Sequence, residues 1–410
     1  MRLKFLLLLI SLISLTLMLA LLTGSLHLAN AYDSQATQAT IGDGTAASCQ
    51  SQDAANALSN AVAAGGVINF DCGSEMVTIT VNTNTTDQTV IVNGDGRITL
   101  DGENLRQIFY VYDNGNLTLN DLVLIDGNAG SGGGLSIGPQ ASATINRSMF
   151  ISNEATDNGG AIYNQGVLFL NHSSLGSNIA ANSGGAIYNN GGAVNIVSSY
   201  LISNQTTNGG GILSFGGTVN MEMSALRSNI ATGWGGGVYV SGGTTQLVNN
   251  TFSDNRADRG GGLYKAGEAT LTNNTFNENR ADLGGALYNA AGSSTVKNNI
   301  FANSLDEAGS GPSLNCDGPP LTSAGRNIVS DNSCVAEPSD LLSTDPLLGI
   351  WNAMGGPLRA YALLPGSPAI DYGLDCPSVD QRGWPRPLGA ACDVGSIEYG
   401  GIIFLPLIIK

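Results

Sequence analysis

The chain has 410 residues, with 32 acidic and 16 basic side chains, 56 glycines and two histidines. Only 12% of the residues are charged and 6% are aromatic, which argues against a conventional two-layer core rich in Phe and Trp. The net charge of −16 argues against nucleic acid as a partner, because phosphates demand clustered Lys and Arg. Two histidines are too few for a multi-histidine metal site.

Residues 1–31 have the features of a secretory signal peptide. Arg2 and Lys4 precede a long apolar run, and the segment ends on the small residues of Ala29-Asn30-Ala31. The run is also long enough for an uncleaved membrane anchor. We interpret it as a removed leader, which predicts an exported protein with no transmembrane domain in the mature chain.

Six cysteines lie outside the repetitive middle of the chain, and no two of them form a Cys-x-x-Cys pair. We therefore favour disulfides over a zinc site, as expected for an oxidising compartment. Many pairings are open, but three local loops are the simplest. These would join Cys49 to Cys72, Cys316 to Cys334, and Cys376 to Cys392.

We expect residues 32–76 to form an N-terminal cap built around a short helix. The helix would run from Asp53 to Ala64, with Asp53 as its N-cap and Gly65-Gly66 as its end. Its apolar side would cover the open end of the first coil of the structure that follows, where unpaired strand edges invite aggregation. The residues on that side are Ala54, Leu58, Ala61 and Val62.

The middle of the chain repeats with a period of about 25 residues, most regularly from about residue 130 to residue 305. Segments such as Gly159-Gly160-Ala161-Ile162-Tyr163 recur, and their aliphatic positions form a first column. That column is Leu135, Ile162, Ile187, Ile212, Val238, Leu263 and Leu287. A second column is Phe150, Leu175, Leu201, Leu226, Phe252, Phe276 and Phe301. Asn follows three residues later, at Asn153, Asn178, Asn204, Asn229, Asn255 and Asn279.

Short alternating runs between these turns exclude a helical repeat, and the period is too short for a propeller blade. It suffices for about three strands and three turns, which predicts one coil of a parallel β-helix stacked at ~4.8 Å per coil. The aliphatic columns would point inward, and the Asn column would form an amide ladder. We place the β-helix at residues 77–305, with strands near Val77–Val81, Phe109–Val111 and Leu117–Leu119 as entry coils, and expect about nine coils.

The repeated GGAIYN and F/L-x-x-N motifs resemble those of chlamydial-type polymorphic outer-membrane proteins and related bacterial surface β-helix proteins. Residues 306–399 resemble the choice-of-anchor Q domain that follows such repeats, through Leu363-Leu364-Pro365-Gly366-Ser367-Pro368-Ala369-Ile370-Asp371, Asp380-Gln381-Arg382-Gly383 and Cys392-Asp393-Val394-Gly395-Ser396-Ile397-Glu398-Tyr399. The resemblance implies an all-β, single-stranded, right-handed parallel β-helix, or pectin-lyase-like solenoid, that is exported and attached to the cell surface. We therefore predict a fold with three parts: a short N-terminal capping helix, the solenoid and a disulfide-braced C-terminal cap domain.

The apolar tail at residues 400–410 contains Pro406 and is too short to cross a bilayer as a helix. One hypothesis is a sorting or attachment signal, and the other is a last strand that pairs with the C-terminal domain.

A column of tyrosines directly follows the first aliphatic column and is interrupted by Leu213. Because side chains alternate along a strand, these tyrosines should point outward, where they could stack against sugar rings. The alternative is that they stabilise neighbouring coils. The column is Tyr163, Tyr188, Tyr239, Tyr264 and Tyr288.

Asp258 and Asp282 occupy equivalent places in consecutive coils. Two carboxylates ~5 Å apart could bind Ca²⁺ or share a proton in glycosidic chemistry. Arg256, Arg259 and Arg280 lie close enough in sequence to neutralise them, so we favour a solvated turn with Arg–Asp pairs. We therefore predict no catalytic residue, no metal site and no cofactor.

The sequence thus predicts an exported, surface-attached protein that acts as a non-catalytic, adhesin-like binding or structural module, with glycans or cell-envelope components as partners. The alternative is a polysaccharide lyase or glycoside hydrolase, since parallel β-helices include pectate lyases and polygalacturonases. Fold analogy is a weak argument, and the chain lacks Asp-Asp, Gly-His-Gly and Arg-Ile-Lys. His172 follows a strand as a turn residue, and nothing marks Lys265 or Lys297 as a base. No sequence feature specifies an oligomeric state.

Overall fold

A computed structural model describes residues 37–400 of the chain, apart from residues 336 and 357. The leader expected at residues 1–31 and the tail from residue 401 onward lie outside the described residues, so both interpretations stay predictions. Within the described part, no helix has the length and apolar character needed to cross a membrane.

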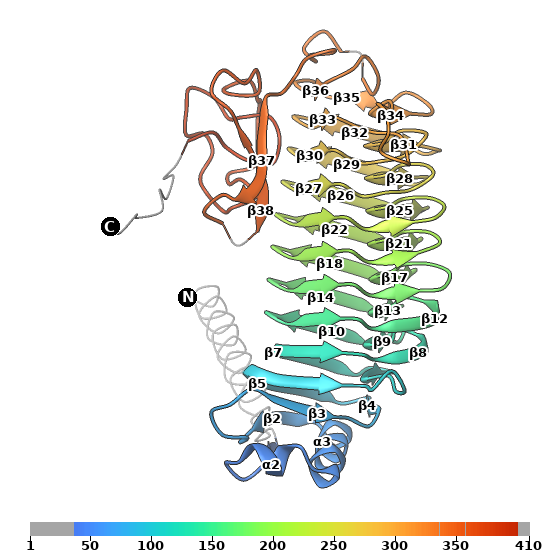
Figure 1. Ribbon diagram of the computed structural model, residues 1–410, viewed down its shortest axis with the longest axis vertical. Coiled ribbons are helices and arrows are strands. Elements are labelled where there is room, and N and C mark those ends of the chain that lie inside the picture. Colours follow the sequence, from blue (N-terminus) through green and yellow to red (C-terminus); the bar gives the residue numbers. More distant parts are fainter. Residues whose placement is uncertain (1–36, 336, 357, 401–410) are drawn as a thin grey trace, which may run out of the picture. The chain divides into compact units, whose positions relative to one another are not determined.

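Two helices stand at the N-terminal end of the solenoid, α2 (Ala46–Cys49) and α3 (Gln52–Ala64) (Figure 1). The helix expected from Asp53 is confirmed, but its N-cap is Ser51, whose Oγ accepts a hydrogen bond from the amide of Ala54 at 3.1 Å. Ser51 has the extended backbone that an N-cap needs, whereas Asp53 lies in the first turn, where its charge favours the helix dipole. The side facing the first coils is confirmed as apolar: Ala54, Leu58 and Val62 are buried and Ala61 is partly buried.

The first strands are less regular than those that follow them. They are β1 (Gln38–Ile41), β2 (Gly66–Phe70), β3 (Val77–Thr80), β4 (Asn84–Thr86), β5 (Thr89–Asp101), β6 (Phe109–Val111) and β7 (Asn116–Ile125). The strands expected near Val77, Phe109 and Leu117 are therefore confirmed as β3, β6 and part of β7.

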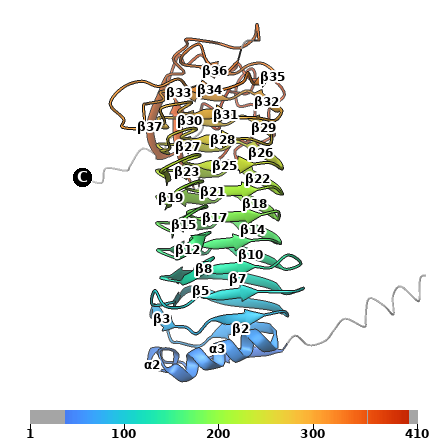
Figure 2. The same ribbon diagram turned by 90° about the vertical axis from the view of Figure 1, so that its right-hand side faces the viewer.

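From β8 onward the chain winds into coils whose strands pair in parallel with the equivalent strands of the next coil (Figures 1 and 2). A five-stranded sheet holds β8 (Asn128–Ser131), β12 (Glu154–Asn158), β16 (Ile179–Ala180), β20 (Gln205–Thr206) and β24 (Ile230–Ala231). A ten-stranded sheet holds β4, β6, β9 (Leu135–Ile137), β13 (Ile162–Asn164), β17 (Ile187–Asn190), β21 (Ile212–Phe215), β25 (Val238–Ser241), β28 (Leu263–Lys265), β31 (Leu287–Asn289) and β34 (Cys316–Asp317).

Each regular coil also gives two strands to a larger sheet, and the turn between them contains a residue with positive φ. The first of the two is β10 (Ser142–Asn146), β14 (Val167–Asn171), β18 (Ala193–Val197), β22 (Thr218–Glu222), β26 (Thr244–Val248), β29 (Glu268–Thr272), β32 (Ser294–Lys297) or β35 (Thr322–Ser323). The second is β11 (Met149–Ile151), β15 (Ser174–Gly176), β19 (Tyr200–Ile202), β23 (Ala225–Arg227), β27 (Thr251–Ser253), β30 (Thr275–Asn277), β33 (Ile300–Ala302) or β36 (Ile328–Val329). These turns use residues as varied as Arg147, His172 and Met223, so positive φ is not confined to Gly and Asn.

The predicted columns are confirmed in register. Ile162 pairs with Leu135 below and Ile187 above, and Phe252 pairs with Leu226 and Phe276, all fully buried. The Asn column forms a continuous buried amide ladder. Its side-chain N–H···O distances are 3.0, 2.9, 2.8, 2.9 and 2.9 Å from Asn153 to Asn279. Each bond joins one coil to the next, so the core and the ladder stabilise the same stacking.

The solenoid is longer than the sequence indicated. Each coil gives one strand to the ten-stranded sheet, so the solenoid has more than the nine coils that we expected. Strands β34, β35 and β36 continue the parallel pairing beyond residue 305. The coils at Asn84–Thr86 and Cys316–Asp317 lack the Gly-Gly consensus. They join the sheet through backbone hydrogen bonds, which leave no side-chain pattern to read.

The rest of the C-terminal region packs against the side of the solenoid and is not stacked on its end, as a terminal cap would be (Figure 1). It contains the antiparallel pair β37 (Leu348–Ala353) and β38 (Arg359–Leu363). Leu363, Ala369 and Val394 form an apolar cluster with Ile300, Ala302 and Ile328 of the last coils. As a result, every residue of β27, β30 and β33 is buried, whereas β11 and β19 keep outward-facing residues at least partly exposed.

All three local disulfides are confirmed. Cys49 bonds to Cys72 beside the N-terminal helices, Cys316 to Cys334 in the last coil, and Cys376 to Cys392 in the region that packs on the side. They brace both ends of the solenoid, where a coil has a neighbour on one side only.

Candidate functional site

The tyrosine column points outward from the ten-stranded sheet, as alternation predicts, and its rings pack on one another. Tyr163 and Tyr188 stack with ring centroids 5.6 Å apart and planes 9° apart. Tyr264 and Tyr288 stack at 5.2 Å and 13°, and Tyr239 meets Tyr264 edge to face at 4.8 Å. Leu213 interrupts the column between Tyr188 and Tyr239.

Trp234 extends this column in a way that the repeat did not reveal. Its indole stacks on Tyr264 at 5.1 Å and 7°, and meets Tyr239 edge to face at 5.9 Å. One coil further on, Arg259 lies over the ring of Tyr288 at 5.5 Å. Trp234 and Arg259 pair across neighbouring coils, so both belong to one loop column beside the tyrosines.

The stacking limits what the column can offer a ligand. Tyr264 has Trp234 on one face and Tyr288 on the other, and only 7% of it is exposed. Its ring is therefore not available for a sugar. Tyr163, Tyr188, Tyr239 and Tyr288 are half-buried and Trp234 is 37% exposed. We define these five outward-facing residues as the aromatic stripe: a rigid row of ring edges, phenol hydroxyls and one indole.

The acidic pair sits in adjacent coils, as expected, and each of its carboxylates has a separate partner. Asp258 lies 3.8 Å from the guanidinium of Arg259, and Asp282 accepts a hydrogen bond from the backbone N–H of Glu307 at 3.2 Å. The other two arginines pair elsewhere, Arg280 with Asp254 at 2.8 Å and Arg256 with Glu307 at 2.9 Å. All four acidic side chains are solvated, so these pairs contribute little.

No cluster of three or more His, Cys, Asp or Glu side chains that could hold a metal occurs in the described range. His172 is an exposed turn residue with φ of 50°, as the sequence indicated.

Lys265, which nothing in the sequence marks as a base, is a buried titratable residue of the ten-stranded sheet. It is fully buried and stands in the inward column of Asn164 and Asn189, two coils beyond Ser214. Its ammonium donates to Asn289 Oδ1 at 2.9 Å and to the carbonyls of Ala291 and Gly292 at 2.8 and 2.9 Å. Burial lowers the pKa of Lys265 to about 8. Side chains alternate along a strand, so the residue after the outward-facing Tyr264 is expected to point inward. Because it faces the core and contacts turn carbonyls, its role is to hold neighbouring coils together.

The motif residues of the C-terminal region form a buried ionic core. Arg386 pairs with Glu398 at 2.9 Å with both side chains 1% exposed, and Arg382 pairs with Asp380 at 2.6 Å. Burial raises the pKa of Asp393 to about 6, and its carboxylate accepts hydrogen bonds from the backbone N–H groups of Asp371 and Tyr399. Every one of these contacts lies within the region, which indicates a structural role for the motif.

A column of asparagines in the turns of the last coils fixes this region to the solenoid. Asn249, Asn273 and Asn298 have positive φ and donate to the carbonyls of Val379, Asp393 and Leu374 at 2.8, 2.9 and 2.9 Å. The sequence carries a signal that we overlooked. Asn-Asn, at residues 249–250, 273–274 and 298–299, replaces the Arg-Ser, His-Ser, Ser-Ser and Met-Ser of the earlier turns.

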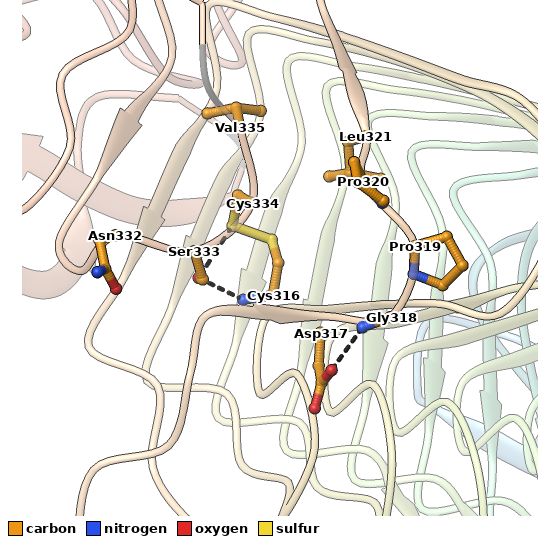
Figure 3. A pocket seen from close by; sticks show the side chains of 10 residues that line it. All are labelled: Cys316, Asp317, Gly318, Pro319, Pro320, Leu321, Asn332, Ser333, Cys334 and Val335. Carbon is orange, nitrogen blue, oxygen red and sulfur yellow. Dashed lines mark hydrogen bonds between the residues drawn. A yellow bond between two sulfur atoms is a disulfide. The ribbon is translucent and has the colours of Figure 1, made fainter.

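A hollow of about 320 Å³ lies in the last coil beside the Cys316–Cys334 disulfide (Figure 3). Its walls include Pro319, Pro320 and the segment from Cys316 to Gly318. The carboxylate of Asp317 accepts a hydrogen bond from the backbone N–H of Gly318 at 2.5 Å. Asp317 is the only ionisable side chain among the residues that line the hollow, and its carboxylate turns toward its own loop.

The model of the family described as the right handed beta helix region matches this chain twice, over residues 133–301 and 211–336. No curated protein and no solved structure gives a significant match. The matches cover the regular coils and extend past residue 305, in agreement with the pairing of β34 to β36. The parallel coils and the family matches together identify the chain as a right-handed parallel β-helix protein.

Proposed function

We propose that this chain is an exported, cell-surface-associated β-helix protein that acts as a non-catalytic, adhesin-like binding and structural module. The observation that carries the proposal is the aromatic stripe, a row of outward rings held by stacking on a rigid sheet. Side chains that are already ordered lose little conformational entropy on binding, and Tyr and Trp combine apolar surface with a hydrogen-bonding end. Glycans and other cell-envelope components are the partners that suit such a surface.

Three disulfides and a signal-like leader support export, since disulfides persist in oxidising compartments. The resemblance of the C-terminal motifs to the choice-of-anchor Q domain supports attachment at that end. Surface attachment is tested by proteolysis of intact cells, which should degrade the protein while cytoplasmic markers survive. Equal protection of the protein and the cytoplasmic marker would contradict display. Deletion of residues 402–410 should release the chain into the medium if the tail is an attachment signal.

Binding by the stripe is tested by substituting Tyr163 and Tyr188. These two half-buried rings stack on each other outside the core, so their removal should leave the core intact. The Tyr163→Ala/Tyr188→Ala variant should lose at least tenfold in retention on isolated cell envelopes, with unchanged circular dichroism. Tyr264→Ala is unsuitable, because its ring is buried. Equal retention of both proteins would overturn the role of the stripe.

The alternative of a polysaccharide lyase or hydrolase is tested in the same material. The mature chain is incubated with a panel of polysaccharides, with and without Ca²⁺. Release of any new reducing end or unsaturated product would overturn the non-catalytic proposal, whereas retention without cleavage agrees with it.

A further inference from the structure

A shallow trough runs along the outer face of the large sheet, away from the aromatic stripe. It has a volume of about 290 Å³ and crosses β18, β22 and β26. One wall is formed by the outward side chains of Asn195, Asn220 and Gln246, which pair in register across the three coils. The other wall, two residues further along each strand, is formed by Val197, Glu222 and Val248. We call this feature the amide trough.

Two of the three amides in this wall are held in a fixed orientation. Asn220 Nδ2 donates to Asn195 Oδ1 at 3.0 Å, which sets the direction of both amides. Among the described residues, the Nδ2 of Asn195, the Oδ1 of Asn220, the amide of Gln246 and the carboxylate of Glu222 have no side-chain partner. The trough therefore presents donors and acceptors in alternation toward solvent.

The trough begins where the outward-facing side chains of the large sheet change in type. In the coils below, Asn93, Asn120, Asn146 and Asn171 bond to one another in an external ladder that satisfies their amides. Val197 ends that ladder, since it stands next to Asn171 in register. On the other wall, Phe169 lies directly below Asn195 and is 41% exposed. An exposed aromatic ring thus continues the amide row at its lower end.

At the upper end, the C-terminal region approaches the trough, because Asn249 bonds to Val379 immediately after Val248. Val248 is only 9% exposed. The C-terminal region therefore lies directly beyond the upper end of the trough.

This arrangement suits a linear polyhydroxylated chain that lies along the axis of the solenoid. Coils repeat at ~4.8 Å and the two walls stand ~7 Å apart, so successive sugar units of an extended glycan would meet successive amides. An aromatic face beside amides is the combination that binds the apolar face and the hydroxyls of a pyranose ring. Glu222 is the one charged residue of the lining, and the chain carries a net charge of −16, so an anionic glycan would be repelled.

We propose that the amide trough is a binding site for a neutral, extended glycan, with Phe169 as the stacking residue and Asn195, Asn220 and Gln246 as hydrogen-bonding residues. The inference goes beyond the proposed function, because it adds a second binding surface on the large sheet, separate from the aromatic stripe.

The test is calorimetric titration of the full mature chain with cellohexaose, xylohexaose, mannohexaose and hexagalacturonate. At least one neutral hexasaccharide should bind, and hexagalacturonate should bind at least tenfold more weakly than that probe. Probes shorter than about three or four sugar units should bind more weakly, because the trough crosses three coils. The Asn220→Ala/Gln246→Ala variant should weaken binding at least tenfold, and Phe169→Ala at least fivefold.

The matched control is Asn171→Ala, which removes an outward amide of the same sheet outside the trough. It should bind the probe as the unchanged protein does. Neutral binding that survives both trough variants would overturn the site. Failure of all three neutral probes would also overturn it, while retention on cell envelopes and surface proteolysis would still test the proposed function separately. Stronger binding of hexagalacturonate than of every neutral probe would overturn the ligand class.

Discussion

The ammonium of Lys265 lies 2.9 Å from Oδ1 of Asn289, in the next coil of the solenoid, and both side chains are buried. In the equivalent place earlier in the repeat, Asn164 donates from Nδ2 to Asn189 Oδ1 at 2.8 Å. Lysine thus stands where earlier coils of this column have an amide, and it still satisfies the acceptors above it, at the cost of burying a charge.

This relationship predicts a specific dependence of stability on pH. Burial lowers the pKa of Lys265 to about 8, while an unfolded lysine titrates near pH ~10.4. Between these values the unfolded chain binds more protons, so the free energy of unfolding should rise with pH, by roughly 2 to 3 kcal/mol at most. Below pH 8 both states are protonated, and the burial penalty is fully present.

The measurement is urea unfolding at pH 7 to 10 for the unchanged protein and for Lys265→Met. The unchanged protein should gain stability relative to Lys265→Met as the pH rises. Lys297→Met is the control, because Lys297 is partly exposed and pairs with Asp375 at 3.1 Å. If the free energy of unfolding depended on pH in the same way for the unchanged protein and for Lys265→Met, the buried charge would be contradicted.

The buried amide ladder should respond strongly to the loss of one rung. Asn229 Oδ1 accepts from both the backbone and the side chain of Asn204, and its Nδ2 donates to Leu201 O and Asn255 Oδ1. Asn229→Ala leaves these buried groups without partners, and we expect a loss of about 3 kcal/mol in the free energy of unfolding. Asn220→Ala removes a single exposed amide bond and should cost less than about 0.5 kcal/mol. Equal losses in chemical denaturation would show that the buried ladder has no special role.

The aromatic stack predicts unequal effects for two tyrosines with the same sequence context. Tyr264→Ala removes a ring held between Trp234 and Tyr288, and should destabilise the protein by about 3 kcal/mol. Tyr163→Ala removes a half-buried ring with one stacked neighbour, and should cost about 1 kcal/mol. Thermal denaturation of both variants checks the order. A larger loss for Tyr163→Ala would be inconsistent with the stack.

Tyr361 should control how firmly the C-terminal region packs on the solenoid. Its hydroxyl contacts Ser253 Oγ at 2.7 Å and donates to Glu278 Oε2 at 2.9 Å, and burial raises the pKa of Tyr361 to about 12. Tyr361→Phe leaves the buried hydroxyl of Ser253 without this partner, at a cost of about 1 to 2 kcal/mol, whereas the exposed carboxylate of Glu278 can turn to water. Amide hydrogen exchange should therefore quicken in residues 345–399 and stay unchanged in β10 to β18. Tyr372→Phe is the control, because its hydroxyl contacts Ser339 O and not the solenoid. Uniform quickening along the whole chain would contradict a local role.

Several features of the site could have been found in the sequence. The inward direction of Lys265 follows from strand alternation, and the Asn-Asn pairs at 249–250, 273–274 and 298–299 mark the coils that carry the C-terminal region. The cap of α3 was misplaced by two residues because Ser51 and Asp53 are both good capping types, and only the backbone conformation separates them.

The sequence by itself determined the period, the inward columns and the amide ladder. Each depends on contacts between a residue and its copy in the next coil, and such contacts repeat in the sequence as they do in space. Only the tertiary structure decided that the C-terminal region covers β27, β30 and β33, that Trp234 closes one face of Tyr264, and that Asn195, Asn220 and Gln246 line a trough. These are contacts between side chains that do not repeat, and their partners are chosen by shape and burial after the solenoid has formed.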